Sequence, residues 1–408
     1  MIYALINIVL YFCLFFYYRK KEKGIDIYQI IVSLYLGTAI MCTINYSKHP
    51  NNWQDLGFIP FLYMFVVVSI MFQPIRHFSL NPQAFQWRDN SKLFFLGCFY
   101  IILAFLDTYY YYDDTIERIT DVDWGKLRNQ FYNDEDSIQL YKNQWEKLIK
   151  NLLTYLRPFA VIYAFFQTTK KGNITFSILL FLAIIIPTFV TATMVASRGM
   201  IFNLTISLIL GFLLFKNKMP KRNVYILSIC GVIISVLFFI YATSVTVSRF
   251  GEDEAGSSVA EYFGVSMLAF NDGVFYNMYD FGYGKNFFAW FIDLFGGDSS
   301  FDTAKAGSTH GTAFFTIVGS LYIDWGPIGT IIVAYLAYIL ISRFTRKKMV
   351  MMSDMVIIFF YINLLAAGIF AFGRGRALVW IMTFVVYFIV RLLETKEVPH
   401  KITKQELL

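Results

Sequence analysis

Residues 174–215 decide the fold: they read ITFSILLFLAIIIPTFVTATMVASRGMIFNLTISLILGFLLF, and Arg198 is the only charged residue among them. About 20 consecutive apolar residues cross the hydrocarbon core of a bilayer, so this stretch is long enough for two crossings joined by a tight turn. The whole chain has the same character. Of its 408 residues 57% are apolar and 15% charged, and its mean hydropathy is +0.54. Ordinary soluble domains have about 25% charged residues, so the composition excludes a soluble enzyme and predicts a polytopic membrane protein.

Further apolar runs of this length predict an all-α fold with about eleven transmembrane helices, which together form one integral membrane domain over residues 1–408. The first run begins at Met1 without a basic region before it, and we interpret it as a retained helix rather than a signal peptide. The ninth run is overlong and contains Gly326-Pro327, so we expect a tilted or broken helix there. The predicted segments lie near residues 2–18, 27–45, 58–74, 93–111, 152–168, 173–195, 200–215, 224–243, 313–342, 354–372 and 377–391.

Loops that follow the odd-numbered segments are rich in Lys and Arg, for example Arg19 to Lys23 and Arg343 to Lys348. Short loops of this kind stay in the cytoplasm, which predicts an N-terminus outside and a C-terminus inside. Two long segments, 112–151 and 244–312, then lie on the outer, periplasmic face. Both carry Trp and Tyr at amphipathic helical spacing, so we expect them to fold back on the membrane surface, and the second to carry part of a functional site.

Four arginines stand directly beside apolar segments on the predicted outer face, where the positive-inside tendency disfavours them. Arg198 stands in a turn so tight that its side chain must point into protein, lipid headgroups or a bound anion. Arg374 and Arg376 lie in a second short turn, and Arg249 follows the eighth segment. Ionisable residues at the membrane are costly and mark functional sites by default. The alternative is that each arginine only anchors its helix by reaching lipid phosphates.

His310 is the candidate acid–base residue, because it lies between small polar residues just before the ninth segment. An imidazole gains and loses a proton near neutral pH. The alternative interpretation is that Thr309 caps a helix and His310 is an uninvolved neighbour.

The remaining polar features predict neither a metal nor another cofactor. The four cysteines lie in apolar runs, and no nucleotide-binding or zinc-binding motif occurs in the sequence. One group of acidic residues shares its loop with basic residues, and we interpret it as a solvated surface of mixed charge. The members of this acidic cluster are Asp107, Asp113, Asp114, Glu117, Asp121 and Asp123.

An outer face has no ATP or nucleotide sugars, so a synthetic reaction there needs a donor that arrives already activated. A lipid diphosphate sugar fits this requirement. Its leaving group carries about two negative charges, which arginines at headgroup depth stabilise without a divalent metal. His310 would accept the proton of the acceptor hydroxyl, and aromatic residues of the outer segments would stack on sugars.

Three parts of the sequence resemble the Wzy-type O-antigen and capsular oligosaccharide repeat-unit polymerases. They are Ser-Arg-Gly at 197–199, Ser-Arg-Phe at 248–250, and Gly-Ser-Thr-His-Gly-Thr…Gly-Ser-Leu-Tyr-Ile-Asp-Trp-Gly-Pro-Ile-Gly at 307–329. The resemblance implies a metal-independent, inverting glycosyltransferase of the GT-C type in the bacterial inner membrane. Such an enzyme transfers the growing glycan from undecaprenyl diphosphate to a new lipid-linked repeat unit at the periplasmic face.

We therefore expect catalytic roles for Arg198, Arg249 and His310. Binding of the diphosphate or the sugars is expected of Arg374, Arg376, Tyr322 and Asp324. The Arg-x(10)-Gly pattern of the family is not kept, because Ile209 and Ala260 stand where the glycines would. The expected partners are an undecaprenyl-diphosphate-linked oligosaccharide, the lipid bilayer and a chain-length regulator, and no nucleic acid.

Two other functions remain open. An O-antigen ligase, which moves glycan onto a lipid A core, combines arginines with a His in the same loop region. A flippase or transporter of lipid-linked oligosaccharides would have ionisable residues near the bilayer midplane and broken helices in paired positions. We expect the interiors of the predicted segments to be nearly free of charge, which disfavours transport.

Overall fold

The computed structural model describes residues 1–19, 26–53, 56–80, 84–85, 87–88, 90–120, 124, 143–170, 174–250, 261–278, 280–299, 315–370 and 375–396. Each predicted apolar segment coincides with a helix in it. Within these residues eight helices are long and apolar enough to cross a membrane, and α1 and α15 are shorter apolar helices. The chain is therefore an all-α, multi-pass membrane protein. The helices that match the predicted segments are α1 (Ile2–Arg19), α2 (Ile27–Lys48), α3 (Phe58–Leu80), α4 (Ser91–Tyr110), α7 (Gln144–Thr168), α8 (Ile174–Met194), α9 (Arg198–Phe215), α10 (Lys221–Phe250), α14 (Thr316–Thr345), α15 (Met352–Ala367) and α16 (Arg376–Leu393).

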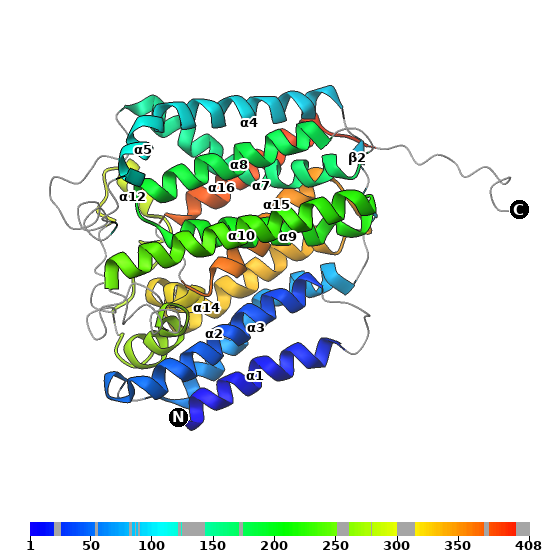
Figure 1. Ribbon diagram of the computed structural model, residues 1–408. Coiled ribbons are helices and arrows are strands. Elements are labelled where there is room, and N and C mark those ends of the chain that lie inside the picture. The colour runs from blue at the N-terminus through cyan, green and yellow to red at the C-terminus, as the bar shows by residue number, and fades with distance from the viewer. Residues whose placement is uncertain are drawn as a thin grey trace, which may run out of the picture.

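The helices lie side by side, with α1, α2 and α3 on one flank of the bundle and α4 on the other (Figure 1). The central helix is α15, which packs against helices of both flanks and is buried along nearly its whole length. Two tyrosine hydroxyls tie it to its neighbours. Tyr35 donates to the carbonyl of Leu365 at 3.0 Å, and Tyr361 donates to the carbonyl of Met71 at 2.9 Å.

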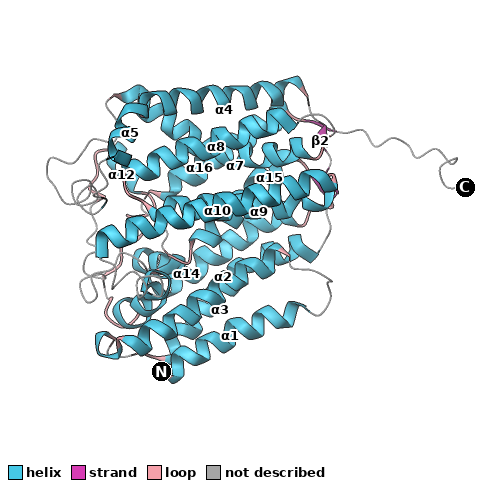
Figure 2. Cartoon of the chain, in the orientation of Figure 1, coloured by secondary structure: helices cyan, strands magenta, loops and turns pink. Residues whose placement is uncertain are grey.

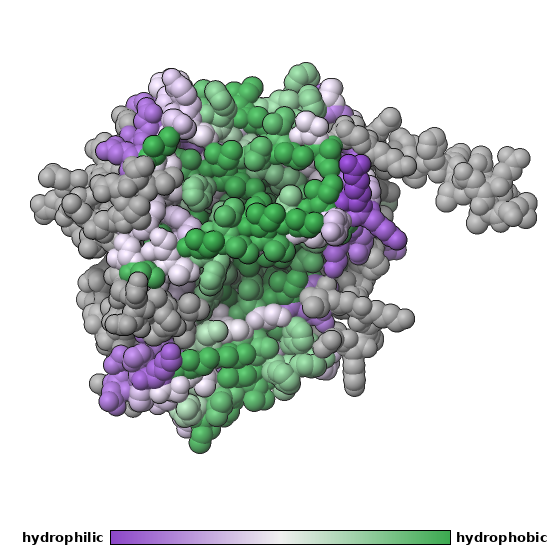
Figure 3. Space-filling model, viewed as in Figure 1, coloured by the Kyte–Doolittle hydropathy of each residue, from purple (hydrophilic) through white to green (hydrophobic). Residues whose placement is uncertain are grey.

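The outer surface of the bundle is apolar where a bilayer would surround it. Figure 3 shows a broad apolar region across the middle of the visible face, with polar residues toward both ends. The most exposed of the long helices is α10, because only 6% of the residues in its most apolar stretch are buried inside the protein. Such a surface is stable only against lipid.

The predicted break in the ninth segment is present in α14. Gly326 has φ 69° and ψ −177°, a backbone conformation outside the helical range, and Pro327 follows it. A break leaves carbonyls without helical partners. The N–H groups of Gly282 and Gly284 donate to the carbonyls of Ile323 and Asp324 at 3.0 and 3.3 Å. The segment around residue 283 therefore satisfies part of the backbone that the break exposes.

The two ends of the bundle are built differently. We call the end where α8 meets α9 the hairpin end, and the end where α9 finishes and α10 begins the basic end. At the basic end two short strand pairs join distant parts of the chain, and Figure 2 shows a strand there. The pairs are β1 (Ala84–Phe85) parallel to β3 (Met349–Val350), and β2 (Trp87–Arg88) antiparallel to β4 (Thr395–Lys396). The N-terminus lies at the hairpin end and β2 at the basic end (Figure 1).

The boundaries of the two predicted outer segments need correction. At the first, α7 begins at Gln144 rather than at 152, because Asn143 caps it by accepting from the N–H of Glu146 at 2.9 Å. At the second, α10 continues to Phe250. Both segments contain shorter helical elements. The first contains α5 (Tyr112–Thr120). The second contains a helix over 261–268 that continues as the π-helix η3 (Ala269–Val274), and α12 (Ala289–Leu294). Two 3-10 helices, η1 (Pro50–Asn52) and η2 (Lys216–Lys218), lie elsewhere in the chain.

Candidate functional site at the hairpin between α8 and α9

Arg198 is the first residue of α9, directly after a very short turn. The N–H of Ser197 donates to the carbonyl of Ala192 at 2.9 Å, which closes the end of α8. Ala196 has φ 47°, in the left-handed region that ordinarily favours glycine. The hairpin therefore stores backbone strain two residues before Arg198, and strained backbone of this kind gathers at functional sites.

The guanidinium of Arg198 is held on two sides. Its Nη1 donates to Oγ1 of Thr246 in α10 at 2.6 Å, and its Cζ lies 4.6 Å from the centre of the Tyr262 ring. Gly199 permits this approach, because a Cβ there would meet the Tyr262 hydroxyl at 3.3 Å. Arg198 is thus an oriented cation at the hairpin end.

The ring that holds Arg198 also contacts the segment that leads to the second predicted arginine turn. The Tyr262 and Phe370 rings lie 4.9 Å apart, and Phe370 also packs on Phe202 and Phe263 at 5.3 Å each. The hydroxyl of Ser266 donates to the carbonyl of Ile369 at 2.7 Å. Phe370 is thereby fixed beside the Tyr262 ring, on which Arg198 packs. Arg374 itself lies outside the described residues.

The end of α10 lies at the same place. Thr246, which accepts from Arg198, is one helical turn before Arg249. The side chain of Arg249 is outside the described part of the chain, but its helix end lies beside the start of α9. His310 is outside the described residues as well.

Arg376 is the first residue of α16, and Asp324 helps to hold that helix end. The two carboxylate oxygens of Asp324 accept from the N–H groups of Asn286 and Phe287 at 3.1 and 2.9 Å. The carbonyls of the same two residues accept from the N–H groups of Gly375 and Ala377 at 2.7 and 3.0 Å. Asp324 is 2% exposed. In the structure its carboxylate supports the backbone around Arg376, and the sequence did not indicate this role.

Tyr322 is also engaged inside the protein. Its hydroxyl donates to the carbonyl of Phe275 at 3.2 Å, and its ring lies 5.7 Å from the rings of Tyr63, Phe270 and Phe281. These rings form an aromatic cluster beside the break in α14, where the Tyr63 hydroxyl donates to the carbonyl of Pro327 at 2.6 Å. Binding of substrate by Tyr322 and Asp324 stays a prediction.

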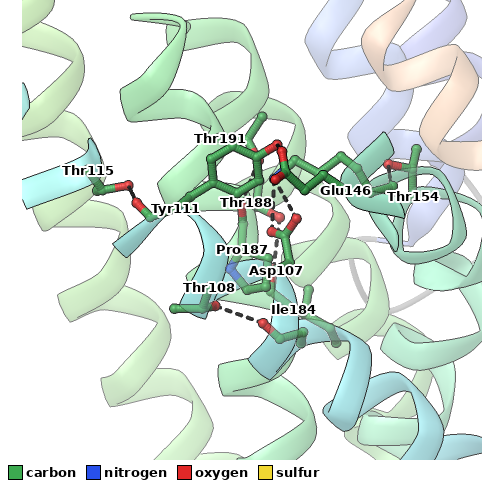
Figure 4. Close-up of polar contacts among 12 residues, drawn as sticks. Asp107, Thr108, Tyr111, Thr115, Glu146, Thr154, Ile184, Pro187, Thr188 and Thr191 are labelled. Atoms are coloured by element: carbon green, nitrogen blue, oxygen red, sulfur yellow. Dashed lines mark hydrogen bonds and ion pairs between the residues drawn. The ribbon is translucent and has the colours of Figure 1, made fainter. Parts of the chain in front are cut away.

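The interpretation of the acidic cluster as a solvated surface is wrong for Asp107. Its side chain is 1% exposed, and Lys150 of α7 donates to both of its oxygens at 2.8 and 3.0 Å (Figure 4). Asp113 and Glu117 are exposed, as expected of a surface, and Asp121 and Asp123 lie outside the described residues. Within the described part of the chain, no group of three or more His, Cys, Asp or Glu side chains could hold a metal.

The expectation that the interiors of the predicted segments are nearly free of charge also needs correction. Arg157 lies within the predicted fifth segment, in the middle of α7 and directly before Pro158. It interacts with the hydroxyl of Tyr100 in α4. Its position in an apolar run was visible in the sequence, whereas its partner depends on which helices are neighbours.

The site thus consists of Arg198, the helix end that carries Arg249, and the segment that precedes Arg374. Such an arrangement suits an anion at the membrane edge, because guanidinium groups present forked donors to phosphate or carboxylate oxygens. Comparison of the chain with protein-family models, with curated proteins and with solved structures gives no match.

Proposed function

We propose that this protein is a glycosyltransferase that polymerises oligosaccharide repeat units linked to undecaprenyl diphosphate. The growing glycan is transferred, with inversion and without a metal, onto a new lipid-linked repeat unit at the periplasmic face of the bacterial inner membrane. The observation that supports the proposal is the position of Arg198. It is oriented by Thr246 and Tyr262 at the hairpin end, beside the helix end of Arg249 and the segment before Arg374.

In this mechanism Arg198 and Arg249 stabilise the charge that develops on the departing diphosphate. A fixed guanidinium contributes more than a mobile one, because it needs no reorganisation as the bond breaks. His310 accepts the proton of the attacking hydroxyl. Arg374 and Arg376 bind phosphate, and Tyr322 and Asp324 bind sugar after a rearrangement that frees their side chains.

The proposed topology has eleven spans in a GT-C-like arrangement, with the N-terminus in the periplasm and the C-terminus in the cytoplasm. The basic end would then face the cytoplasm, in agreement with the distribution of Lys and Arg. A membrane-impermeant thiol reagent tests this orientation. A cysteine introduced at exposed Asp113 should react in intact spheroplasts, and one at exposed Arg222 should react only after lysis.

The decisive experiment supplies the purified protein in lipid with its lipid-linked repeat unit alone. A ladder of products supports a polymerase, whereas product only after addition of a lipid A core identifies an O-antigen ligase. Arg198→Ala and Arg249→Ala should each remove the ladder, and Arg222→Ala at the basic end is the matched control. Full turnover in both arginine variants would refute the role in stabilising the leaving group. Full turnover of His310→Ala between about pH 6 and 8 would refute the role of His310 as the base.

Transport of a lipid-linked oligosaccharide is the second candidate. Two observations favour it: the break in α14 at Gly326, and the charged residues Arg157, Lys150 and Asp107 inside the bundle. In proteoliposomes a flippase would move a labelled lipid-linked oligosaccharide between leaflets without lengthening its glycan. Lengthening without transfer between leaflets favours the polymerase.

A further inference from the structure

Helices α4 and α7 face each other with three polar pairs, which we call the polar ladder. Lys150 pairs with Asp107, the hydroxyl of Tyr111 donates to Oε2 of Glu146 at 3.3 Å, and Arg157 interacts with Tyr100. Figure 4 shows Asp107, Tyr111 and Glu146 directed toward one another. One side of the ladder is formed by Tyr100 and Asp107 of α4 with Tyr111 at its C-cap, and the other side by Glu146, Lys150 and Arg157 of α7.

The register of the polar ladder is regular. On the α4 side the steps run four residues from Tyr111 to Asp107 and seven more to Tyr100. On the α7 side they run four residues from Glu146 to Lys150 and seven more to Arg157. Steps of four and seven residues keep side chains on one face of a helix. The two faces therefore match over three antiparallel rungs. Lys150 also lies 4.8 Å from the centre of the Tyr111 ring, which links the first two rungs.

The ladder joins the two ends of the chain segment 111–146, because Tyr111 begins it and Glu146 ends it. Ion pairs and hydrogen bonds with little access to water are stronger than exposed ones, and Glu146 is buried as well as the Lys150–Asp107 pair. The segment is thus held firmly at the point where it leaves and re-enters the bundle.

One residue of this segment reaches the arginine site. Trp124 is buried against Ala196 and Val245, and its ring lies 5.5 Å from that of Tyr241. Ala196 is two residues before Arg198, and Val245 directly precedes Thr246, which accepts from Arg198. The indole N–H of Trp124 has no hydrogen-bond partner in the described part of the chain, so apolar packing holds the ring.

The contact of Trp124 with Val245 helps to position the end of α10, because α10 has few other contacts with the protein. Most of α10 is exposed, so the position of its end depends on its contacts at the hairpin end. These contacts include the Arg198–Thr246 hydrogen bond, the bond from the Tyr241 hydroxyl to the Ala192 carbonyl at 3.0 Å, and the packing of Trp124 on Val245. Loss of the indole would leave a cavity between α10 and the hairpin.

We propose that Trp124 is a positioning residue for Arg198, and that the polar ladder is the anchor that seats Trp124 on the α8–α9 hairpin. Trp124 keeps Val245 against Ala196, and thereby keeps Thr246 within reach of Arg198. The effect on catalysis rests on the proposed glycosyl transfer. The packing of Trp124 on the α8–α9 hairpin does not depend on that function.

Thiol labelling tests the packing of Trp124 on the hairpin without any assay of activity. Val245 is fully buried, and Val245→Cys in a background without the four native cysteines should react slowly with a maleimide. Trp124→Ala and Asp107→Asn should each accelerate the reaction by about tenfold or more, because the cavity and the loosened anchor open the contact. Trp145→Ala removes an indole that is 71% exposed on α7 and is the matched control.

If the Val245→Cys thiol reacts no faster in the Trp124→Ala background than in the Trp145→Ala control, the proposal is overturned. If Asp107→Asn does not give folded protein, because Lys150 then lacks a counter-charge, Tyr111→Phe tests the outermost rung instead. It removes the hydroxyl that donates to Glu146 and keeps the ring beside Lys150. An unchanged rate in both ladder variants would refute the anchor.

The catalytic part is tested with the lipid-linked repeat unit as substrate. Trp124→Ala should lower turnover at saturating substrate by about tenfold or more with little change in KM, because the site binds substrate but holds Arg198 poorly. Trp124→Phe should restore most of the turnover. A change in KM alone would refute the positioning role. A wild-type protein without polymerase activity would refute the proposed function and leave the labelling result intact.

Discussion

The paired charges of the basic end and Arg198 at the hairpin end are held by different kinds of contact. At the basic end charged side chains pair with one another, as Lys347 does with Asp354 at 2.6 Å and Arg391 with Glu394 at 2.7 Å. At the hairpin end the hydroxyl of Thr246 and the ring of Tyr262 hold the guanidinium of Arg198 in one orientation. Paired charges hold segments together, whereas an oriented cation attracts an anion. We therefore expect changes at the basic end to alter stability, and changes at the hairpin end to alter activity.

The largest expected effect is that of Arg198→Ala on turnover. Loss of one oriented donor to a developing oxyanion lowers turnover by about 100- to 1,000-fold. Arg198→Lys should recover only part of it, because an ammonium group lacks the planar fork. Product ladders in proteoliposomes measure the effect, and unfolding curves in detergent should match those of the wild type. If Arg198→Ala unfolds at a lower denaturant concentration than the wild type, Arg198 has a structural role like that of the paired charges at the basic end.

Asp354→Asn should reduce stability with little effect on turnover per folded molecule. The carboxylate is 1% exposed, and besides Lys347 it accepts from the N–H of Met351 at 3.2 Å. Weakening a buried charged hydrogen bond of this kind costs about 1–3 kcal/mol. Chemical unfolding in detergent measures the change. Lys348→Ala is the control, with a loss below about 1 kcal/mol, because its side chain is exposed.

Gly326→Ala tests the break in α14 and should destabilise the protein by about 1–3 kcal/mol. The conformation at Gly326 is essentially restricted to glycine, and a Cβ there would meet the Phe281 ring at 3.2 Å. Gly231→Ala in α10 is the control. A Cβ at Gly231 meets nothing within 4 Å, so alanine should be neutral or stabilising by up to about 1 kcal/mol. Equal effects of the two substitutions would show that the break bears no strain.

The smallest expected effect is that of Ala196→Gly, which should change the free energy of unfolding by less than about 1 kcal/mol. Glycine adopts positive φ without strain, but its lack of a methyl group removes packing on Trp124. Ala242→Gly, inside α10, should instead lose about 1 kcal/mol. Thermal unfolding of the two variants gives the comparison. An equal loss in both would mean that the strain at Ala196 is compensated within the hairpin.

The positions of the helices could be predicted because the signal is local. A bilayer demands about 20 apolar residues in succession, and a helix lies within each of the predicted segments. Gly326-Pro327 likewise marks the break in α14 from its own residues. The start of α7 was missed, because its first turns carry charges that only neighbouring helices shield.

The candidate site could be predicted only in part. Arg198 was evident from a charge between two long apolar runs. The pairing of Asp107 with Lys150 was not, because it depends on α4 and α7 being antiparallel neighbours in one register. The role of Asp324 was hidden for the same reason, since its partners belong to a segment 37 and 38 residues away in the chain.

The length of α10 has a consequence for the lipid that this protein needs. A helix of 30 residues is about 45 Å long, whereas the hydrocarbon core of a bilayer is about 30 Å thick. A helix with so little support from its neighbours adapts to this mismatch by tilting. Thr246 lies near the end of this helix and accepts from Arg198, so a change in tilt would move Thr246 relative to the arginine. The chain length of the surrounding lipids, which sets membrane thickness, would then act on the arginine through α10.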